Sequence, residues 1–202
     1  MLLKRTFDII VSTIGLLLLL PVMVLLMLLV RIKVGSPIFF RQKRPGLNEN
    51  AFYMLKFRTM TDERDDEGKL LPDEIRLTPF GSFLRKTSLD ELPELVNILK
   101  GEMSFVGPRP LLFEYLHYYS EKEKLRHSVR PGLTGLAQIS GRNHVKWDQR
   151  LALDVKYVEE WSFWLDVKIL FKTALQVMSS KDVVVVPSSK FGKLSEERDK
   201  KK

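Results

Sequence analysis

A run of 22 residues without a charged side chain, from Ile9 to Val30, constrains the fold of this chain more than any other feature of its sequence. Eighteen of the 22 residues are hydrophobic. As an α-helix, such a run is about 33 Å long, which is enough to cross a bilayer core of about 30 Å. A domain that folds entirely in water does not need a segment of this kind, so the sequence predicts association with a membrane.

Two details favour a segment that enters the bilayer and returns over one that spans it. Pro21 lies within the run, where it removes a backbone hydrogen bond and predicts a kink. Basic residues flank both ends, Lys4 and Arg5 before the run and Arg31 and Lys33 after it. Because positive charge favours the cytoplasmic side, both ends are expected there. A single-pass helix is the alternative, since spanning helices tolerate proline. The length of the run disfavours a cleaved signal peptide.

The charge of the chain is concentrated beside this segment. The net charge is +8, and residues 31–58 carry +6 of it, whereas residues 59–186 carry −2. Lysine and arginine next to a membrane segment attract anionic phospholipids by about 1 kcal/mol each. A nucleic-acid-binding domain more often carries its basic residues on the globular surface. The distribution therefore predicts a phospholipid partner and argues against nucleic acid, and the absence of cysteine excludes disulfides and thiol catalysis.

The chain divides into three parts by pattern. We expect a membrane-anchoring helix over residues 1–36, a cytosolic domain over 37–186 and a basic, disordered tail over 187–202. The predicted fold class is α+β and predominantly helical, with a Pro-kinked re-entrant membrane helix, a small β-hairpin and interfacial amphipathic helices. Predicted helices cover residues 79–86, 111–126, 148–160 and 161–178. The last is amphipathic, and its pattern fits equally a helix lying in the membrane interface and one packed on the core.

The hairpin is predicted from two short strands, residues 37–41 and 51–59, around a turn at 45–50. Lys56 and Arg58 share one face of the second strand, where they could meet a phosphate or simply form a solvated face. The acidic segment that follows, residues 61–69, is predicted to be an exposed loop because it has few apolar residues.

The most informative segment begins at Ser88 and continues into a helix that ends at Gly101. Ser88 and Glu91 fit a capping box; alternatively Asp90 caps the helix, which places Pro93 in the first turn. In either case Asp90 and Glu91 need only complete a helix. The functional interpretation uses the same geometry, because free backbone N–H groups at a helix start favour anions and keep a carboxylate ionised. Such a carboxylate, beside one that holds Mg²⁺, could attack a phosphorus atom.

Two further motifs suit phosphate or a close backbone approach. Arg109 stands between two prolines, which stiffen the turn and present a planar guanidinium, although a surface arginine in a rigid turn has the same pattern. Glycines at 132, 135 and 141 would allow the backbone to approach a ligand. Neither motif is a dinucleotide fingerprint or a Walker loop.

Three segments in this order resemble the bacterial sugar transferase family: Lys56-Phe-Arg-Thr-Met60, Ser88 to Pro110 and Arg130-Pro-Gly-Leu-Thr-Gly-Leu-Ala-Gln138. These are monotopic polyprenol-phosphate phosphoglycosyl transferases. The resemblance runs from about Lys4 to about Val186 and has the length of the minimal, single-domain members. It implies a cytosolic catalytic domain on the cytoplasmic face of the bacterial inner membrane, where the first membrane step of glycan or glycoconjugate biosynthesis takes place. It also favours the re-entrant helix, although Leu20 stands where many members have a serine.

The resemblance implies a reaction and a set of site residues. Asp90 would attack the sugar-bearing phosphate of a UDP-sugar and release UMP, and undecaprenyl phosphate would then take the phosphosugar. Glu91 would act with Asp90 in catalysis and bind the Mg²⁺ cofactor. Downstream glycosyltransferases are further partners. The expected phosphate or nucleotide contacts are Arg109, Lys56, Arg85 and Arg142.

The sequence leaves open which UDP-sugar and which glycan pathway are involved, the oligomeric state, and how the bend at Pro21 is stabilised. The alternative function is a non-catalytic, membrane-anchored scaffold in which Asp90 and Glu91 only cap a helix.

Overall fold

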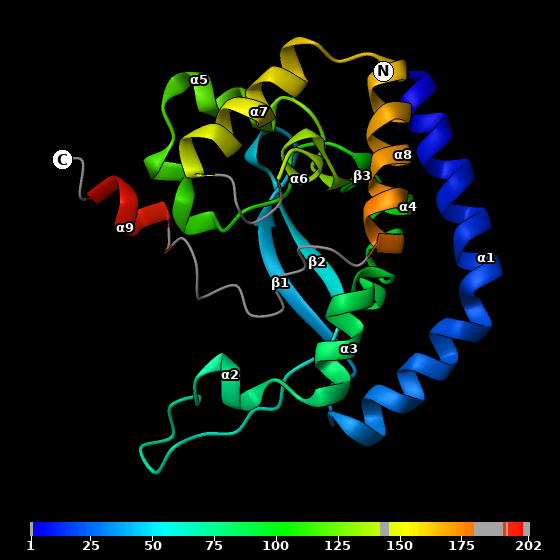
Figure 1. Ribbon diagram of the computed structural model, residues 1–202, viewed down its shortest axis with the longest axis vertical. Coiled ribbons are helices and arrows are strands. Elements are labelled where there is room, and N and C mark those ends of the chain that lie inside the picture. The colour runs from blue at the N-terminus through cyan, green and yellow to red at the C-terminus, as the bar shows by residue number, and fades with distance from the viewer. Residues whose placement is uncertain (1, 142–145, 180–191, 193, 200–202) are drawn as a thin grey trace.

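The computed structural model describes residues 2–141, 146–179, 192 and 194–199 (Figure 1). Most of the described chain is helical, and its strands form two separate two-stranded sheets, so the predicted α+β, mainly helical class is confirmed. The elements in chain order are α1 (Leu2–Lys33), β1 (Phe39–Pro45), η1 (Leu47–Glu49), β2 (Ala51–Phe57), α2 (Asp73–Arg76), α3 (Pro79–Thr87), η2 (Leu89–Glu91), α4 (Glu94–Lys100), β3 (Ser104–Val106), η3 (Phe113–Tyr118), α5 (Glu121–Lys124), η4 (Leu125–His127), β4 (Gly132–Thr134), α6 (Leu136–Ile139), α7 (Trp147–Glu159), α8 (Phe163–Ser179) and α9 (Leu194–Asp199).

The long helix α1 is attached to the rest of the molecule near both ends. Near its start, Arg5 donates hydrogen bonds to the carbonyls of Ile98 and Leu99, at 2.6 and 2.7 Å. At its end, Val30 is completely buried in a core cluster that includes Phe57. Both ends of the apolar run therefore contact the same domain.

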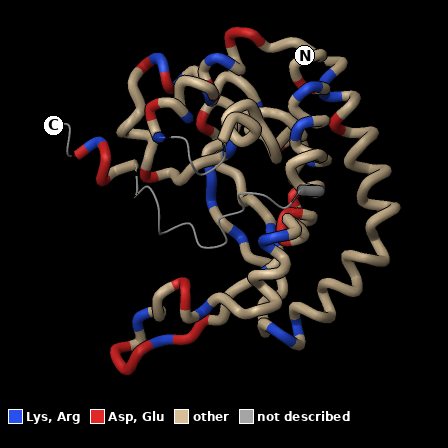
Figure 2. Tube along the Cα trace, in the orientation of Figure 1, with Lys and Arg blue, Asp and Glu red and all other residues tan. Residues whose placement is uncertain are grey.

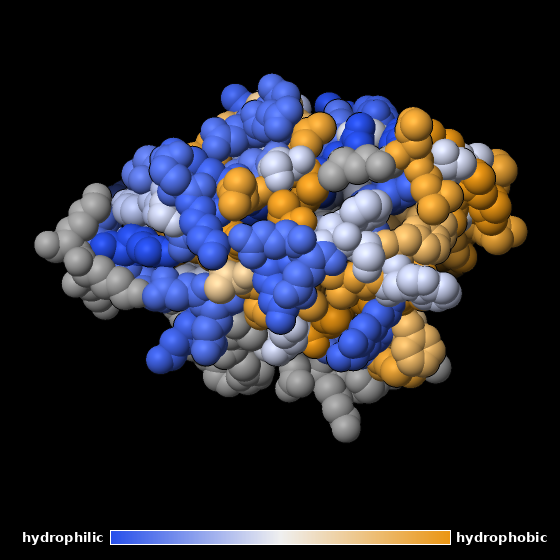
Figure 3. Space-filling view, turned by 90° about the horizontal axis from the view of Figure 1, so that it is seen from above, coloured by the Kyte–Doolittle hydropathy of each residue, from blue (hydrophilic) through white to orange (hydrophobic). Residues whose placement is uncertain are grey.

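Between these attachments the outer side of α1 is apolar and uncovered. Leu17 is 68% exposed and Leu18 is 73% exposed, and only 17% of the most apolar window of the helix is buried. Figure 3 shows apolar residues gathered on the side of the molecule where α1 lies. Among the described residues, α1 is the one helix long and apolar enough to cross a membrane. Because water disfavours such a surface, lipid is its natural environment.

Pro21 lies inside α1, which continues through it as one helix, and Figure 1 shows that α1 bends so that its last turns lie below α3. Proline leaves the carbonyl four residues earlier without its helical partner. That carbonyl belongs to Leu17, and the nearby hydroxyl of Ser12 donates elsewhere, to the carbonyl of Ile9, at 3.2 Å.

The predicted hairpin is confirmed, with β1 and β2 antiparallel and Phe40 opposite Lys56. Phe52 and Met54, on the same strand face as Lys56, are buried against α4. The solvated-face interpretation is therefore wrong for both cations, since the Lys56 side chain is only 14% exposed and Arg58 is buried. Arg58 has a local role, because its guanidinium donates to backbone carbonyls and pairs with Asp62.

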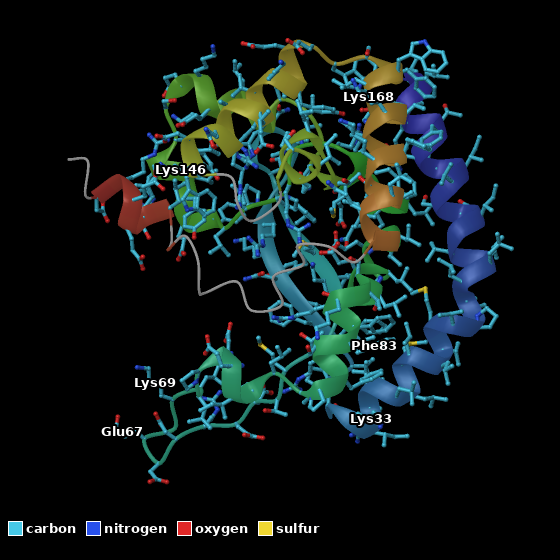
Figure 4. All side chains as sticks on the ribbon, in the orientation of Figure 1. Lys33, Glu67, Lys69, Phe83, Lys146 and Lys168 are labelled. Carbon is cyan, nitrogen blue, oxygen red and sulfur yellow. The ribbon has the colours of Figure 1, made fainter. Side chains whose placement is uncertain are left out.

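The acidic loop is exposed as predicted. Figure 2 shows its acidic residues at one end of the molecule, and Figure 4 shows Glu67 and Lys69 on this loop, away from the body.

The single helix predicted over residues 111–126 is wrong. The chain forms η3, α5 and η4 instead. The physical reason is a new helix start at Ser120, whose hydroxyl accepts from the Glu123 backbone while the Glu123 carboxylate accepts from the Ser120 backbone. Tyr115 and Tyr119, which precede this break, are buried.

Helix α8 packs on the core through its polar side. Asp166 is buried and accepts from Tyr157 at 2.7 Å and Trp161 at 3.1 Å, and Thr173 bonds to Thr134 at 2.7 Å. The outward side carries the large apolar residues Trp164, Phe171 and Leu175, all exposed. Packing on the core and a position in the membrane interface are therefore compatible for α8. Its polar side is packed, and its exposed apolar side suits a membrane interface.

The sequence predicts a disordered tail over residues 187–202, but part of this tail is ordered. Residues 194–199 form α9, in which Leu194 is fully buried and Arg198 pairs with Glu123 and Asp148 at 2.5 and 3.1 Å. One apolar anchor and an ion-pair network hold a segment whose composition alone looks unstructured. The rest of the predicted tail lies outside the described residues, apart from Gly192.

Two of the glycines expected near a ligand pack against backbone instead. A Cβ atom on Gly132 would lie 2.1 Å from the Gly107 nitrogen, and one on Gly135 would lie 2.2 Å from the Gly107 oxygen. These glycines therefore let β4 and the start of α6 approach the turn that contains Arg109. They serve the site by positioning that turn.

Candidate active site

Asp90 and Glu91 lie on η2, a short 3₁₀ turn between α3 and α4. Both predicted capping arrangements are wrong. Ser88 adopts a left-handed conformation (φ 57°) that ends α3, and its side chain caps nothing, while α4 begins only at Glu94, after Pro93. The reversal at Ser88 turns Asp90 inward, where it is 8% exposed. Asp90 is therefore a buried carboxylate in a tight turn and not a cap.

Lys56 of β2 connects the carboxylates of this site. Its Nζ atom is 3.9 Å from Asp90 Oδ2 and 3.2 Å from Glu94 Oε1, and it also bonds to Glu91 Oε1. Glu94 is itself buried, at 1% exposed. One ammonium thus lies among three carboxylates, a group that the described structure encloses almost completely.

Arg109 contacts the same cluster through Glu91. Its Nη2 atom is 2.7 Å from Glu91 Oε1, and its side chain is 42% exposed, so it also faces solvent. Its carbonyl accepts from Arg126 at 2.6 Å, and Arg126 is held by a buried ion pair with Asp154 at 2.8 Å. The backbone on which Arg109 stands is therefore fixed by a buried pair.

The three carboxylates have different protonation behaviour. Burial raises the pKa of Asp90 to about 6 and that of Glu94 to about 7, outweighing the attraction of Lys56. Burial acts on Glu91 in the same direction, but Lys56 and Arg109 outweigh it and hold the pKa of Glu91 well below its usual range. The sequence predicts that a helix start keeps Asp90 ionised, but burial has the larger effect on the pKa of this carboxyl. The ionised form of Asp90 predominates above about pH 6.

The remaining predicted phosphate contacts are Arg85 and Arg142. Arg85 donates from Nε to Thr59 Oγ1 at 3.0 Å, and its charge acts on Asp90 by lowering the pKa of that carboxyl, so it flanks the site. Arg142 lies outside the described residues. The structure thus brings Asp90, Glu91, Lys56 and Arg109 together and places Arg85 beside them.

Sequence reasoning missed Glu94. A carboxylate four residues after Asp90, on a helix whose neighbouring positions are apolar, was the available signal.

The donor set suits Mg²⁺ that arrives with a phosphate ligand. Among the described residues, no three acidic or histidine side chains are arranged to hold a metal ion by themselves. Mg²⁺ prefers carboxylate and phosphate oxygens and commonly takes only one or two carboxylates from the protein. Glu91 is held ionised and Asp90 is adjacent to it, so the residues present fit such an ion.

A buried carboxylate beside cations, on a domain with an uncovered apolar helix, is suited to chemistry on a phosphate at a membrane. Comparison with known proteins agrees with this geometry. The profile of the family described as bacterial sugar transferase matches residues 1–180. The chain belongs to the bacterial sugar transferase family. It is accordingly a sugar-phosphate transferase and a membrane protein, and the scaffold alternative is not supported.

Relatives differ in how much of their length this bacterial sugar transferase covers. It is 54% identical over 184 residues to an uncharacterized sugar transferase, EpsL, of Bacillus subtilis, with 91% of each chain covered. It is 41% identical over 195 residues to the exopolysaccharide production protein ExoY of Rhizobium meliloti, covering 88% of this chain and 86% of that protein. It is also 41% identical over 185 residues to the UDP-glucose:undecaprenyl-phosphate glucose-1-phosphate transferase of Escherichia coli, covering 87% of this chain but only 40% of that protein.

Proposed function

We propose that this chain transfers a phosphosugar from a UDP-sugar to undecaprenyl phosphate, releasing UMP and forming a polyprenyl diphosphosugar. The observation that carries the proposal is the buried Asp90 carboxylate, 3.9 Å from the Lys56 ammonium and next to Glu91. The name of the Escherichia coli relative, UDP-glucose:undecaprenyl-phosphate glucose-1-phosphate transferase, contains the same two substrate classes.

The proposed reaction has two displacements at one phosphorus atom. An Asp90 oxygen attacks the sugar-bearing phosphorus, the bond to the bridging oxygen breaks, and that oxygen leaves as part of UMP. The phosphosugar is then an acyl phosphate on Asp90. An oxygen of undecaprenyl phosphate attacks the same phosphorus, and Asp90 leaves as a carboxylate.

The surrounding residues support these steps by charge. Lys56 and Arg109 lie where they can offset the negative charge that develops on the phosphoryl oxygens, and Arg109 is partly open to solvent. Asp90 and Glu91 would hold Mg²⁺ together with the diphosphate, and the bound ion neutralises phosphate charge. In the structure, Glu91 bonds to Lys56 and Arg109, and it would give up part of these bonds when it binds Mg²⁺.

We further propose that α1 re-enters the cytoplasmic leaflet of the bacterial inner membrane. Its two ends contact the same domain, and Figure 4 places Lys168 of α8 beside the first turns of α1 and Lys33 at its last turn. With both ends on one side, the apolar faces of α1 and α8 lie in lipid and the site lies at the headgroup level. There it can meet a soluble nucleotide and a lipid-linked phosphate.

The direct test is a screen of UDP-sugars for UMP release by the full chain in detergent, with undecaprenyl phosphate and Mg²⁺ present. We expect UMP from at least one UDP-sugar and transfer of its phosphosugar to the lipid. Failure of every UDP-sugar to yield UMP would refute the proposed function.

Glu91→Gln is expected to raise the Mg²⁺ concentration needed for half-maximal UMP release by about tenfold or more, because a neutral amide is a weaker ligand than a carboxylate. A Mg²⁺ titration of the rate measures this shift. The matched control is Glu67→Gln in the exposed loop, which should leave the titration unchanged. An unaltered titration in Glu91→Gln would remove Glu91 from metal binding.

The proposed topology predicts that both flanks of α1 face the same compartment. Because the chain has no cysteine, single cysteines introduced at Leu2 and Ser36 can be labelled with a membrane-impermeant thiol reagent in inside-out vesicles. Both should react in inside-out vesicles and neither in intact spheroplasts. Labelling of the two positions from opposite sides would establish a spanning helix.

A further inference from the structure

Arg44 carries a charge for which the described structure provides no acidic partner. It lies on β1, and its pairing opposite Phe52 puts it on the same sheet face as Lys56. Its Nη2 atom donates to Gln42 Oε1 at 2.5 Å, while its Nε atom is enclosed and has no hydrogen-bond partner among the described residues. A buried N–H group without a partner costs free energy, and a bound anion would supply that partner.

Four nearby groups act on the charge of Arg44. They are Arg109, Glu94, Tyr115 and Tyr119. The pKa of Arg44 falls to about 10, first because of burial and second because of the charge of Arg109. Glu94 is the only carboxylate among these groups, and it already pairs with Lys56 at 3.2 Å. Arg44 therefore has no ion pair of its own among the described residues, and the charge of Arg109 opposes its charge.

Tyr119 supplies a second, independent sign of a missing ligand. It is 6% exposed, and its hydroxyl is enclosed without a hydrogen-bond partner among the described residues. Buried hydroxyls normally have a partner. Because Tyr119 acts electrostatically on Arg44, the two atoms without a partner belong to one region of the molecule.

We propose that Arg44 and Arg109 form a second anion subsite, which binds the nucleotide-side phosphate of the UDP-sugar. The inference rests on the proposed function, because it assigns one phosphate of that substrate. Phe40, opposite Lys56, and Arg44 are four residues apart on β1, or about 13 Å. Arg109 bonds to Glu91, and its charge acts on Arg44. The sugar-bearing phosphate is thus at Asp90, and the phosphate that leaves is on Arg109 and Arg44.

The position of β1 favours the nucleotide over the lipid-linked acceptor. Figure 1 shows β1 on the side of β2 away from α1. The acceptor's hydrocarbon chain lies in lipid and so brings its phosphate from the side of α1. A soluble nucleotide can enter from the opposite side, where Arg44 is.

The test measures UDP binding and steady-state kinetics for Arg44→Gln in the full chain. We expect UDP, in the presence of Mg²⁺, to bind at least about tenfold more weakly by calorimetry, since a lost charged hydrogen bond has an effect of this size. The KM for the UDP-sugar should rise by a similar factor, and the KM for undecaprenyl phosphate should change less than twofold. The matched control is Arg41→Gln, which removes the same charge from an exposed position on the same strand and should leave UDP binding unchanged.

Each other outcome decides against the proposal. A rise in the KM for undecaprenyl phosphate alone would assign Arg44 to the acceptor, and unchanged binding and kinetics would make Arg44 a structural brace. If Arg44→Gln does not fold, Arg44→Lys keeps the charge but loses the planar fork, and UDP binding weakened by less than twofold in that folded variant would overturn the subsite. UDP binding is measured without turnover, so a chain that binds UDP through Arg44 but releases no UMP would refute the proposed reaction and not the subsite.

Discussion

Asp90→Asn is expected to reduce UMP release from the preferred UDP-sugar by at least about a thousandfold. The amide has the size of the carboxylate but cannot form the covalent phosphosugar, and losing a nucleophile removes most of the rate acceleration. The sharpest measurement is a single turnover without undecaprenyl phosphate. The unaltered chain should release about one UMP per molecule and retain the phosphosugar, whereas Asp90→Asn should release none.

The control for Asp90→Asn is Asp66→Asn, in the exposed loop, which should release UMP normally. Stability should not fall in Asp90→Asn, because burial already disfavours the charged form of Asp90. The pH dependence offers a second check. With the pKa of Asp90 near 6, the carboxylate form is lost as pH falls through that value, and the burst rate should fall with it. A full-size UMP burst from Asp90→Asn would contradict the covalent mechanism.

Lys56→Met is expected to have the second-largest effect, because it acts on both stability and rate. It leaves Asp90, Glu91 and Glu94 together without the ammonium that lies among them. Removing one partner from a buried ionic group typically lowers the free energy of unfolding by about 3–5 kcal/mol. The rate of UMP release should also fall by about a hundredfold, since a cation beside the reacting phosphate is lost.

Thermal unfolding in detergent and the UMP burst measure these two effects of Lys56→Met. The matched control is Lys86→Met, at an exposed position of α3, which should have little effect on either. Adding Glu94→Gln to Lys56→Met should recover part of the lost stability, because it removes one of three mutually repelling carboxylates, but it should not restore the rate. Wild-type stability in Lys56→Met alone would mean that Lys56 does not stabilise the three buried carboxylates.

The parts of this structure that follow from local sequence were predicted well. Alternating side chains defined the hairpin, and the uncharged run defined α1. Asp90, Glu91, Lys56 and Arg109 were singled out by motif, and the structure brings them together. In each case the deciding signal lies within a few consecutive residues or within one motif.

The parts that depend on distant contacts were not predicted. The segment from Ser88 to Pro93 fits two capping registers, and the structure uses neither because Ser88 reverses the chain. Burial, which only the folded chain reveals, raises the pKa of Asp90. The helix of residues 194–199 depends on ion pairs with Glu123 and Asp148, which are remote in sequence. Arg44 was not singled out because its missing partner is visible only in three dimensions.

The attachment of α1 has a consequence for how the protein is made. Arg5 bonds to the carbonyls at the end of α4, and Asp8 accepts from Ser104 and from the Phe105 backbone, both at 3.1 Å. Arg5 and Asp8 precede these partners by 93 to 97 positions, so α1 is synthesised before the partners exist. On the proposed topology, membrane insertion of α1 would precede folding of the domain, and α4, which follows Asp90, would gain its final hydrogen bonds only when it folds back onto a helix already in the bilayer.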